Sequence, residues 1–246
     1  MHVEPAAIVA SVFLLAGLVK GLVGLGLPTI AMGLLSFAMP PAAAASLLLV
    51  PSFVTNVWQL LLGPSVRALL RRLWTLIAGL VAGTLVGGLP TLAAAPAWTH
   101  AALGAVLAAY GAWGLAAARL PEPGRHEIWL SPLVGYLTGA VTAATGVFVI
   151  PAVPYLQSLR FGRDDLIQAL GLSFTASTLA LAVQLGLSSS LQPVDLGLSA
   201  LALVPALAGM ALGQALRRVI SERAFRRCFF AGLAALGVYM MLAARA

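Results

Sequence analysis

The chain has 246 residues, of which 61% are hydrophobic and 9% are charged, and its formal net charge is +7. This composition is too apolar for a water-soluble domain and indicates an integral membrane protein. Because the arginines form short clusters between apolar runs, the positive charge is typical of cytoplasmic membrane loops and not of a nucleic-acid surface. A single cysteine, Cys228, excludes an intramolecular disulfide and a cysteine metal cluster.

Charges, prolines and glycine-rich breaks divide the chain into apolar segments, of which a crossing helix needs about 20 residues. The N-terminus lacks the basic leader and cleavage site of a signal peptide, so we expect its apolar segment to be retained. The first half, residues 1–118, contains a broken segment over 6–37 and predicted spans over 42–62, 73–93 and 97–118. A polar cytoplasmic linker occupies residues 119–127. The second half, residues 128–246, contains a broken segment over 128–158 and predicted spans over 166–185, 196–216 and 228–244.

The two halves also resemble each other in detail. The stretch "GLVKGLVGLGLPTIAMGLL" in the first half matches "GYLTGAVTAATGVFVIPAV" in the second, with Gly21 falling on Gly139 and Lys20 on Thr138. Likewise, "AASLLLVPSFVTN" resembles "GLSFTASTLALAV". Such self-similarity at a fixed spacing predicts an internal structural repeat.

The positions of the basic residues predict how the repeats are oriented. Cytoplasmic loops of membrane proteins carry an excess of lysine and arginine. Twelve of the fourteen basic residues lie in four clusters, at 67–72, 119–125, 160–163 and 217–227. All four clusters face the cytoplasm only if segment 128–158 is a hairpin that enters and leaves on one side. By symmetry, segment 6–37 is a hairpin entering from outside. The predicted fold is an all-α polytopic membrane protein of two inverted repeats, each a broken re-entrant-type hairpin followed by three transmembrane helices, with both termini outside.

Inverted repeats with broken helices in corresponding places are typical of secondary transporters, whose substrate binds near the midplane where the breaks meet. A break leaves backbone N–H and C=O groups free, which is tolerated only inside protein or beside a wet cavity. In "GLGLPT" the glycines permit a turn and the proline suits the start of the next half-helix; "TAATG" has hydroxyls in the corresponding place. Half-helix N-termini favour anions. The candidate substrate-binding residues at the breaks are Gly24, Gly26, Thr29, Thr142, Thr145 and Gly146.

Polar residues on two of the predicted spans are further candidates. In the span over 42–62 they are Ser52, Asn56 and Gln59, at positions i, i+4 and i+7 of one helix face. In the span over 166–185 they are Gln168, Thr175 and Thr178, which share a face with Gly171. These faces could meet across a central cavity and donate hydrogen bonds to an oxyanion. The alternative is ordinary hydrogen bonding between membrane helices.

Lys20 is the only charged residue well inside a predicted span. All seven acidic residues lie in loops or at span ends. A cation carrier or a carboxylate proton relay usually keeps an acidic residue inside the membrane, so this distribution favours an anion as the substrate. Two roles for Lys20 stay open, because it either lies in the anion path or extends to the membrane surface as an anchor.

The sequence resembles the TauE/SafE family of membrane permeases over nearly its whole length. The resemblance is carried by "GLVKGLVGLGLPTIAMGLLSFAMPPAAAASLLLVPSFVTN", "GYLTGAVTAATGVFVIPAVPYL" and "GRDDLIQALGLSFTASTLALAV". It implies transport of a small sulfur-containing anion such as sulfite, sulfoacetate or another organosulfonate, outward in some members and inward in others. A common family variant has a GGGG-like break before Thr-Ile-Pro and an Asn-Lys pair. Here the break reads "GLGLPTIA" and no lysine follows Asn56, so site residues do not carry over from that variant.

These observations predict a secondary permease that works by alternating access in the cell inner membrane. An anion channel of the same fold and a non-transporting membrane assembly subunit are the alternatives. The three histidines lie in terminal or loop positions without metal-ligand spacing, and no phosphate-binding motif is present, so we expect neither an enzyme nor a cofactor. The expected partners are the small anion and the lipid bilayer, with no nucleic acid, and a homodimer stays open.

Overall fold

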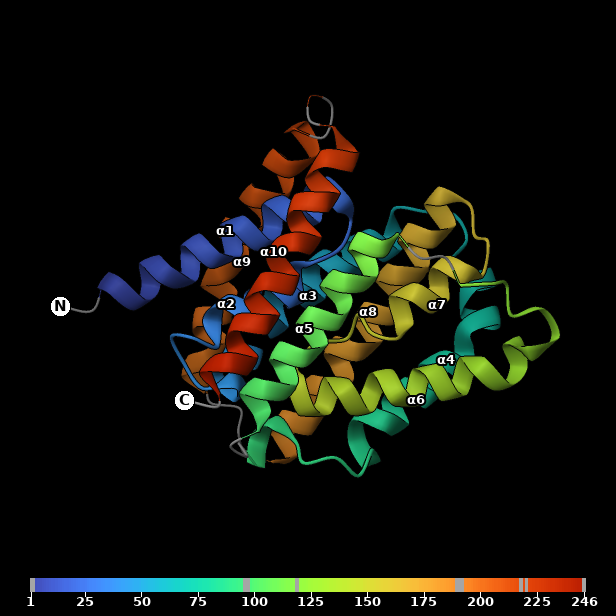
Figure 1. The fold of residues 1–246 in the computed structure, drawn as a ribbon, viewed down its shortest axis with the longest axis horizontal. Coiled ribbons are helices and arrows are strands. Elements are labelled where there is room, and N and C mark those ends of the chain that lie inside the picture. The colour runs from blue at the N-terminus through green and yellow to red at the C-terminus, as the bar shows by residue number, and fades with distance from the viewer. Residues whose placement is uncertain are drawn as a thin grey trace.

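The computed structural model describes residues 3–94, 98–117, 120–188, 193–216, 219 and 221–244. Within these residues the regular structure is entirely helical, as predicted (Figure 1). The first half contains α1 (Val3–Val23), α2 (Leu27–Leu35), α3 (Pro41–Leu61), α4 (Val66–Val86), the short 3₁₀ helix η1 (Leu92–Ala94) and α5 (Thr99–Ala116). After η2 (Gly124–His126), the second half contains α6 (Glu127–Thr145), α7 (Ala152–Ser158), α8 (Arg163–Leu187), α9 (Pro193–Leu216) and α10 (Glu222–Ala243).

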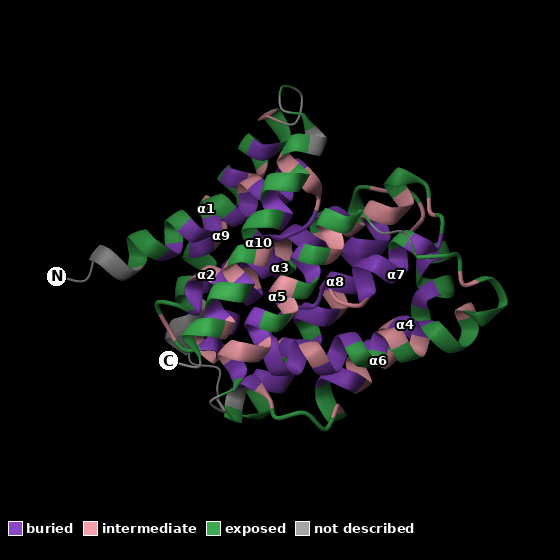
Figure 2. Cartoon of the chain, viewed as in Figure 1, coloured by how far each residue is buried: buried purple, intermediate pink, exposed green. Residues whose placement is uncertain are grey.

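Seven of the described helices are long and apolar enough to cross a membrane, namely α1, α3, α4, α6, α8, α9 and α10. The protein is therefore a multi-pass membrane protein. α5, the remaining long helix, packs along α10. Buried residues concentrate where the helices face one another, and many large apolar side chains face outward, as expected for lipid contact (Figure 2).

Two predicted spans were wrong at their N-terminal ends. The span predicted over 73–93 is α4, which already begins at Val66, and the span predicted over 228–244 is α10, which begins at Glu222. The prediction ended each apolar run at the neighbouring arginines. The helices continue through those arginines because their long side chains can extend to water while the backbone stays helical.

Helices of the two halves pack against each other in a regular pattern. α1 packs against α9, α6 against α4, and α5 against α10, while α3 lies against both α8 and α9 and α8 also lies against α4. The first helix of each half thus contacts the fourth helix of the other half, and the last helices of the two halves contact each other (Figure 1). The two halves are interlocked through these contacts.

Small residues allow the closest of these helix pairs to form. A Cβ atom added at Gly21 of α1 would lie 2.9 Å from the backbone nitrogen of Gln214 in α9. A Cβ atom added at Gly139 of α6 would lie 2.6 Å from the backbone nitrogen of Thr84 in α4. Such small-residue contacts allow membrane helices to approach closely. The two glycines that the sequence aligns therefore have equivalent packing roles.

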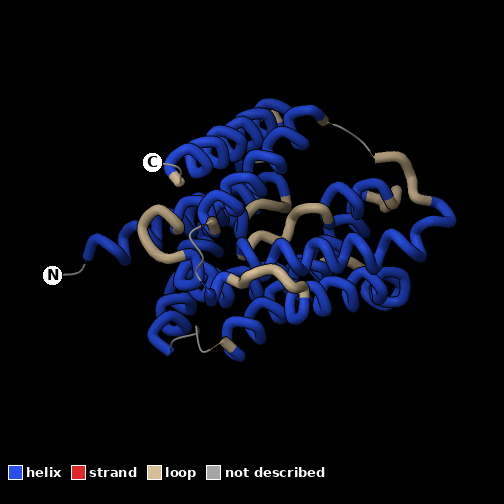
Figure 3. Tube along the Cα trace, turned by 60° about the horizontal axis from the view of Figure 1, so that its bottom comes forward, coloured by secondary structure: helices blue, strands red, loops and turns tan. Residues whose placement is uncertain are grey.

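Both broken segments turn back within the fold. α1 ends before Gly24 and Gly26, which have φ values of 81° and 105°, and α2 then packs beside α1. α6 ends at Gly146, with φ 71°, and the chain returns through α7. The Arg160 side chain at the end of this return forms an ion pair at 2.8 Å with Glu122 of the linker. The two ends of segment 128–158 therefore lie on the same side of the bundle. A second view shows the described helices and the loops that join them (Figure 3).

Candidate functional site

Lys20 is buried in the last turn of α1, directly before the first break, with 4% of its surface exposed. Its Nζ donates a hydrogen bond at 3.0 Å to Thr55 Oγ1 and another to Asn56 Oδ1, both on α3. The ammonium group therefore lies inside the bundle. The alternative in which Lys20 extends to the membrane surface does not describe this structure.

Asn56 connects this lysine to a third helix. Its amide Nδ2 donates to Thr178 Oγ1 on α8 at 3.4 Å, and Asn56 is fully buried. Three of the predicted site residues, Lys20, Asn56 and Thr178, thus form one chain of hydrogen bonds between α1, α3 and α8. Two of the three come from the polar faces that the sequence identified.

Pro51 modifies α3 one turn before Asn56. A proline has no N–H, so the carbonyl of Leu47 lacks its usual helical partner. The Ser199 hydroxyl of α9 donates to this carbonyl at 2.7 Å and accepts a hydrogen bond from the Val50 N–H at 3.0 Å. The freed backbone group is therefore satisfied by a neighbouring helix, as the apolar interior of a membrane protein requires. Ser199 belongs to none of the sequence patterns considered above.

The two predicted glutamines bind backbone groups. Gln59 Nε2 donates to the Gly24 carbonyl at 3.2 Å, within the first break, and to the Ile167 carbonyl at 3.0 Å. Gln168 Nε2 donates to the carbonyls of Leu60 and Gly63 at the end of α3. Gln59 therefore holds the broken end of α1 beside Lys20, Thr55, Asn56 and Thr178, which we call the Lys20 cluster. Gln168 instead caps the end of α3.

The predicted threonines donate their hydroxyl protons to carbonyls of the preceding turn. The pairs are Thr29 with Gly26, Thr142 with Thr138, Thr145 with Val141, Thr175 with Gly171, and Thr178 with Phe174. A hydroxyl has only one proton to donate, so in this conformation none of these threonines has a donor free for an anion. Ser52 is different, because its buried Oγ has no hydrogen-bond partner in the described part of the chain.

The two breaks contact different neighbours. Space for a Cβ atom at Gly26 is limited by Phe229 of α10, at 3.1 Å, whereas at Gly146 it is limited by Met32 of α2, at 2.8 Å. The structure therefore brings Gly24 and Gln59 to the Lys20 cluster. Thr142 and Thr145 bond within α6, and Gly146 lies against Met32 of α2, the helix that follows the first break.

The positive charge of Lys20 has no negative partner among the described residues. The two ion pairs found there are Arg72 with Glu127, at 2.7 Å, and Arg160 with Glu122, both at the ends of helices. Lys20 instead has the neutral oxygens of Thr55 and Asn56. The interior of the bundle is therefore electropositive at this point.

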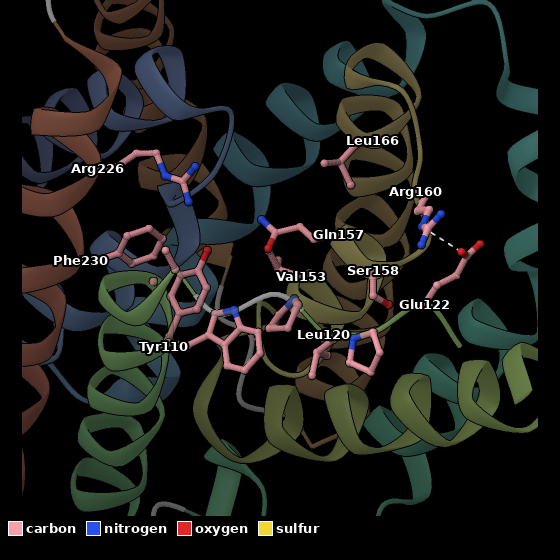
Figure 4. Close-up of a pocket in the computed structure, with 15 residues that line it drawn as sticks. Tyr110, Leu120, Glu122, Val153, Gln157, Ser158, Arg160, Leu166, Arg226 and Phe230 are labelled. Carbon is pink, nitrogen blue, oxygen red and sulfur yellow. Dashed lines mark ion pairs between the residues drawn. The ribbon is translucent and has the colours of Figure 1, made fainter. Parts of the chain in front are cut away.

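A cavity of about 780 Å³ lies between α5, α7, α10 and the linker (Figure 4). Its lining includes Tyr110, Trp113, Gln157, Arg160, Arg226 and Phe230. In the sequence, Arg226 belongs to a basic loop cluster, and no pattern singles out Tyr110, Trp113 or Phe230. Their common location depends on the packing of α5 against α10, which a single sequence does not reveal.

Comparison with known proteins identifies the family. The family model described as "Sulfite exporter TauE/SafE" matches residues 9–240. No curated protein and no solved structure matches the chain. The matched region includes Lys20 and both breaks. It also covers the seven long apolar helices except for the first turns of α1 and the last residues of α10. The chain belongs to the TauE/SafE family, a family of membrane transporters.

Proposed function

We propose that this protein is a secondary transporter of a small sulfur-containing anion, such as sulfite, sulfoacetate or another organosulfonate. The observation that carries the proposal is the buried Lys20 ammonium with only neutral partners. Transfer of an ammonium from water into a protein interior costs several kcal/mol, which neutral dipoles offset only in part. A bound anion supplies the missing negative charge.

The chemistry of the cluster suits an oxyanion. Lys20 has donors only, Asn56 has a second amide N–H besides the one donated to Thr178, and the buried Ser52 hydroxyl has no partner within the described structure. A sulfonate or sulfite has several oxygens that accept hydrogen bonds. Hydrogen bonds to charged groups are stronger than those between neutral groups, so Lys20 and the anion contribute most of the binding energy.

Alternating access follows from the proposed repeat architecture. We take residues 1–118 and 128–246 as inverted repeats, since their helices make equivalent cross-contacts. The Lys20 cluster joins α1 and α3 of the first repeat to α8 of the second. Movement of one repeat against the other would therefore open the cluster to either side. With the basic helix ends in the cytoplasm, the inside-negative potential of the inner membrane favours export, whereas import requires a coupled cation.

The test is the variant Lys20→Gln, which keeps a hydrogen-bond donor and removes the charge. In proteoliposomes containing the purified protein, we expect sulfonate flux to fall roughly tenfold or more. A fall of this size corresponds to the loss of one hydrogen bond between charged groups. Arg125→Gln serves as the charge-matched control, because Arg125 is an exposed linker residue. Flux unchanged in Lys20→Gln contradicts the proposed role.

A thermal-shift panel identifies the anion. Sulfite, sulfoacetate, taurine, toluenesulfonate and matched carboxylates are added to the purified protein. A ligand present at 100 times its Kd stabilises the native state by about 2.7 kcal/mol. If the sulfur anions stabilise no more than the carboxylates, the substrate class is wrong. Saturation and counterflow in proteoliposomes indicate a carrier, whereas unsaturable flux indicates the alternative anion channel.

A further inference from the structure

The cavity between α5, α7, α10 and the linker is separate from the Lys20 cluster. We propose that this cavity is a second anion site, which binds an organic anion with an apolar, preferably aromatic, body. The charged group of the ligand binds at Arg226 and its body lies against the aromatic wall. The inference rests on the proposed function, because it takes the ligand to be a substrate on its way to or from Lys20.

Arg226 is a cation without a carboxylate partner in the described structure. The one acidic side chain lining the cavity, Glu122, is paired with Arg160 at 2.8 Å. The Arg226 guanidinium lies over the ring of Phe230, whose centroid is 5.9 Å from the guanidinium carbon. Its planar set of N–H donors therefore remains open to an anion, and this geometry matches two oxygens of a sulfonate or carboxylate.

Tyr110 provides a second donor beside this cation. The side chain is 1% exposed, and its hydroxyl has no hydrogen-bond partner in the described chain. Figure 4 shows the Tyr110 hydroxyl, the Gln157 amide and the Arg226 guanidinium pointing toward one another. A buried hydroxyl without a partner is unfavourable, so an anion that accepts a hydrogen bond from the Tyr110 hydroxyl is favoured at this point.

Part of the cavity wall is aromatic and aliphatic, beside the polar side chains of Ser158 and the paired Glu122 and Arg160. Tyr110 and Phe230 are in edge-to-face contact, with ring centroids 5.3 Å apart, and Trp113 and Leu166 also line the cavity. Its volume of about 780 Å³ lies within the range of drug-sized ligand sites. A sulfite ion, comparable to a few water molecules of about 30 Å³ each, would leave most of this space to water. An aromatic body fills the cavity and contacts the aromatic rings.

Soluble organic anions and anionic lipids share this chemistry, since both combine a charged group with an apolar body. An adjoining apolar cavity of about 610 Å³ shares Trp113 and Pro154 with the first. We assign the site to the soluble anion because the converging donors lie beside the buried ring of Tyr110. The test therefore includes membranes with and without anionic lipid.

The experiment is a titration of the full-length protein in phosphatidylcholine nanodiscs with toluenesulfonate. Binding is followed by calorimetry and by tryptophan fluorescence. We expect Arg226→Gln to weaken the affinity by roughly tenfold or more, as for a lost hydrogen bond between charged groups. Arg227→Gln is the matched control, because Arg227 is exposed and does not line the cavity. Sulfite should bind at this site at least roughly tenfold more weakly than toluenesulfonate, since it lacks the aromatic contact.

Equal loss of affinity in Arg226→Gln and Arg227→Gln, or no loss in either, overturns the proposal. Addition of phosphatidylglycerol to the nanodiscs separates the two ligand sources. Unchanged toluenesulfonate affinity supports the soluble anion, and competitive displacement assigns the cavity to lipid instead. The Lys20→Gln variant distinguishes this proposal from the proposed function. If Lys20→Gln transports normally while Arg226→Gln loses binding, the transport mechanism is wrong and the cavity site stands; the reverse result rejects only the cavity site.

Discussion

The contact between Lys20 and Asn56 stabilises a buried cation without cancelling its charge. The Asn56 side-chain oxygen accepts a hydrogen bond from the Lys20 ammonium group, and the Asn56 amide N–H donates a hydrogen bond to Thr178. A carboxylate at this position would stabilise the ammonium more strongly and would also neutralise it. The choice of an amide therefore preserves an electropositive interior, which a transported anion requires.

The variant Asn56→Asp tests this reasoning at a single residue. The new carboxylate has nearly the shape of the amide and lies beside Lys20, so the buried charges become paired. We expect the unliganded protein to unfold at the same or a higher temperature, and anion-dependent stabilisation and flux to fall by at least roughly tenfold. Thermal unfolding with and without the anion, together with flux in proteoliposomes, measures both effects.

The variant Asn56→Ala is the comparison, because it removes the hydrogen-bond acceptor and keeps the net positive charge. We expect it to lower the free energy of unfolding by about 2 kcal/mol, the contribution of a hydrogen bond to a charged group, while part of the anion binding persists. An Asn56→Asp variant that still binds and transports the anion would contradict the role of the interior charge.

At this scale the sequence selected polar residues of which some lie together in the structure, and it predicted only part of their geometry. Lys20, Asn56 and Thr178 were selected because they are polar residues in apolar segments, and the structure brings them together. The hydroxyls of Thr142, Thr145 and Thr178 all donate to their own helices, but Thr178 also accepts a hydrogen bond from Asn56 of α3. Threonine in a helix makes such bonds regardless of which face it occupies, so sequence alone does not separate the two cases.

At the scale of helices, small residues determine which pairs form. Gly139 of α6 lies against the backbone of α4 near Thr84, and Gly21 of α1 lies against the backbone of α9. Since lipid is as apolar as the helices themselves, close packing supplies much of the energy of association. These contacts therefore fix the long helices around the Lys20 cluster.

The variant Gly139→Ala tests this packing. An added methyl group would clash with the α4 backbone, which has no flexible side chain to move aside. We expect the free energy of unfolding to fall by roughly 1–3 kcal/mol, the usual cost of overpacking. Gly232→Ala on α10 is the control, because a Cβ atom there has nothing within 4 Å. Its expected effect is neutral or slightly stabilising, since alanine favours a helix more than glycine does. Equal destabilisation by both variants would reject close packing as the cause.

The helices were more predictable than their ends. The breaks near Gly24 and Gly146 were predicted from glycine, proline and hydroxyl patterns, and both residues have the positive φ of a turn. The start of α4 at Val66 was missed because the prediction treated arginines as loop residues. The sequence also did not predict that α6 packs against α4. Small residues indicate that a helix packs closely against another helix, but they do not indicate which one.

At the scale of the whole molecule, several of the described arginines lie near one another at helix ends. Arg72 pairs with Glu127 and lies over the ring of Phe161, and Arg160 pairs with Glu122. Arg226 lines the cavity that also contains Glu122 and Arg160. The start of α1 and the end of α10 lie away from these arginines (Figure 1). This arrangement is the one expected if these arginines are cytoplasmic and both termini are outside.

Cysteine labelling in intact cells tests that orientation. After Cys228→Ala, the only native thiol is gone, and single cysteines are introduced by Arg125→Cys in the linker region and by Ala244→Cys at the end of α10. Because positive loops are retained in the cytoplasm, a membrane-impermeant maleimide should label the Ala244→Cys protein in intact cells and the Arg125→Cys protein only after permeabilisation. The opposite pattern reverses the orientation of the whole chain and with it the inferred direction in which the membrane potential acts. Labelling of both positions in intact cells contradicts the odd number of crossings predicted between the linker and the end of α10, because the two positions would then lie on the same side.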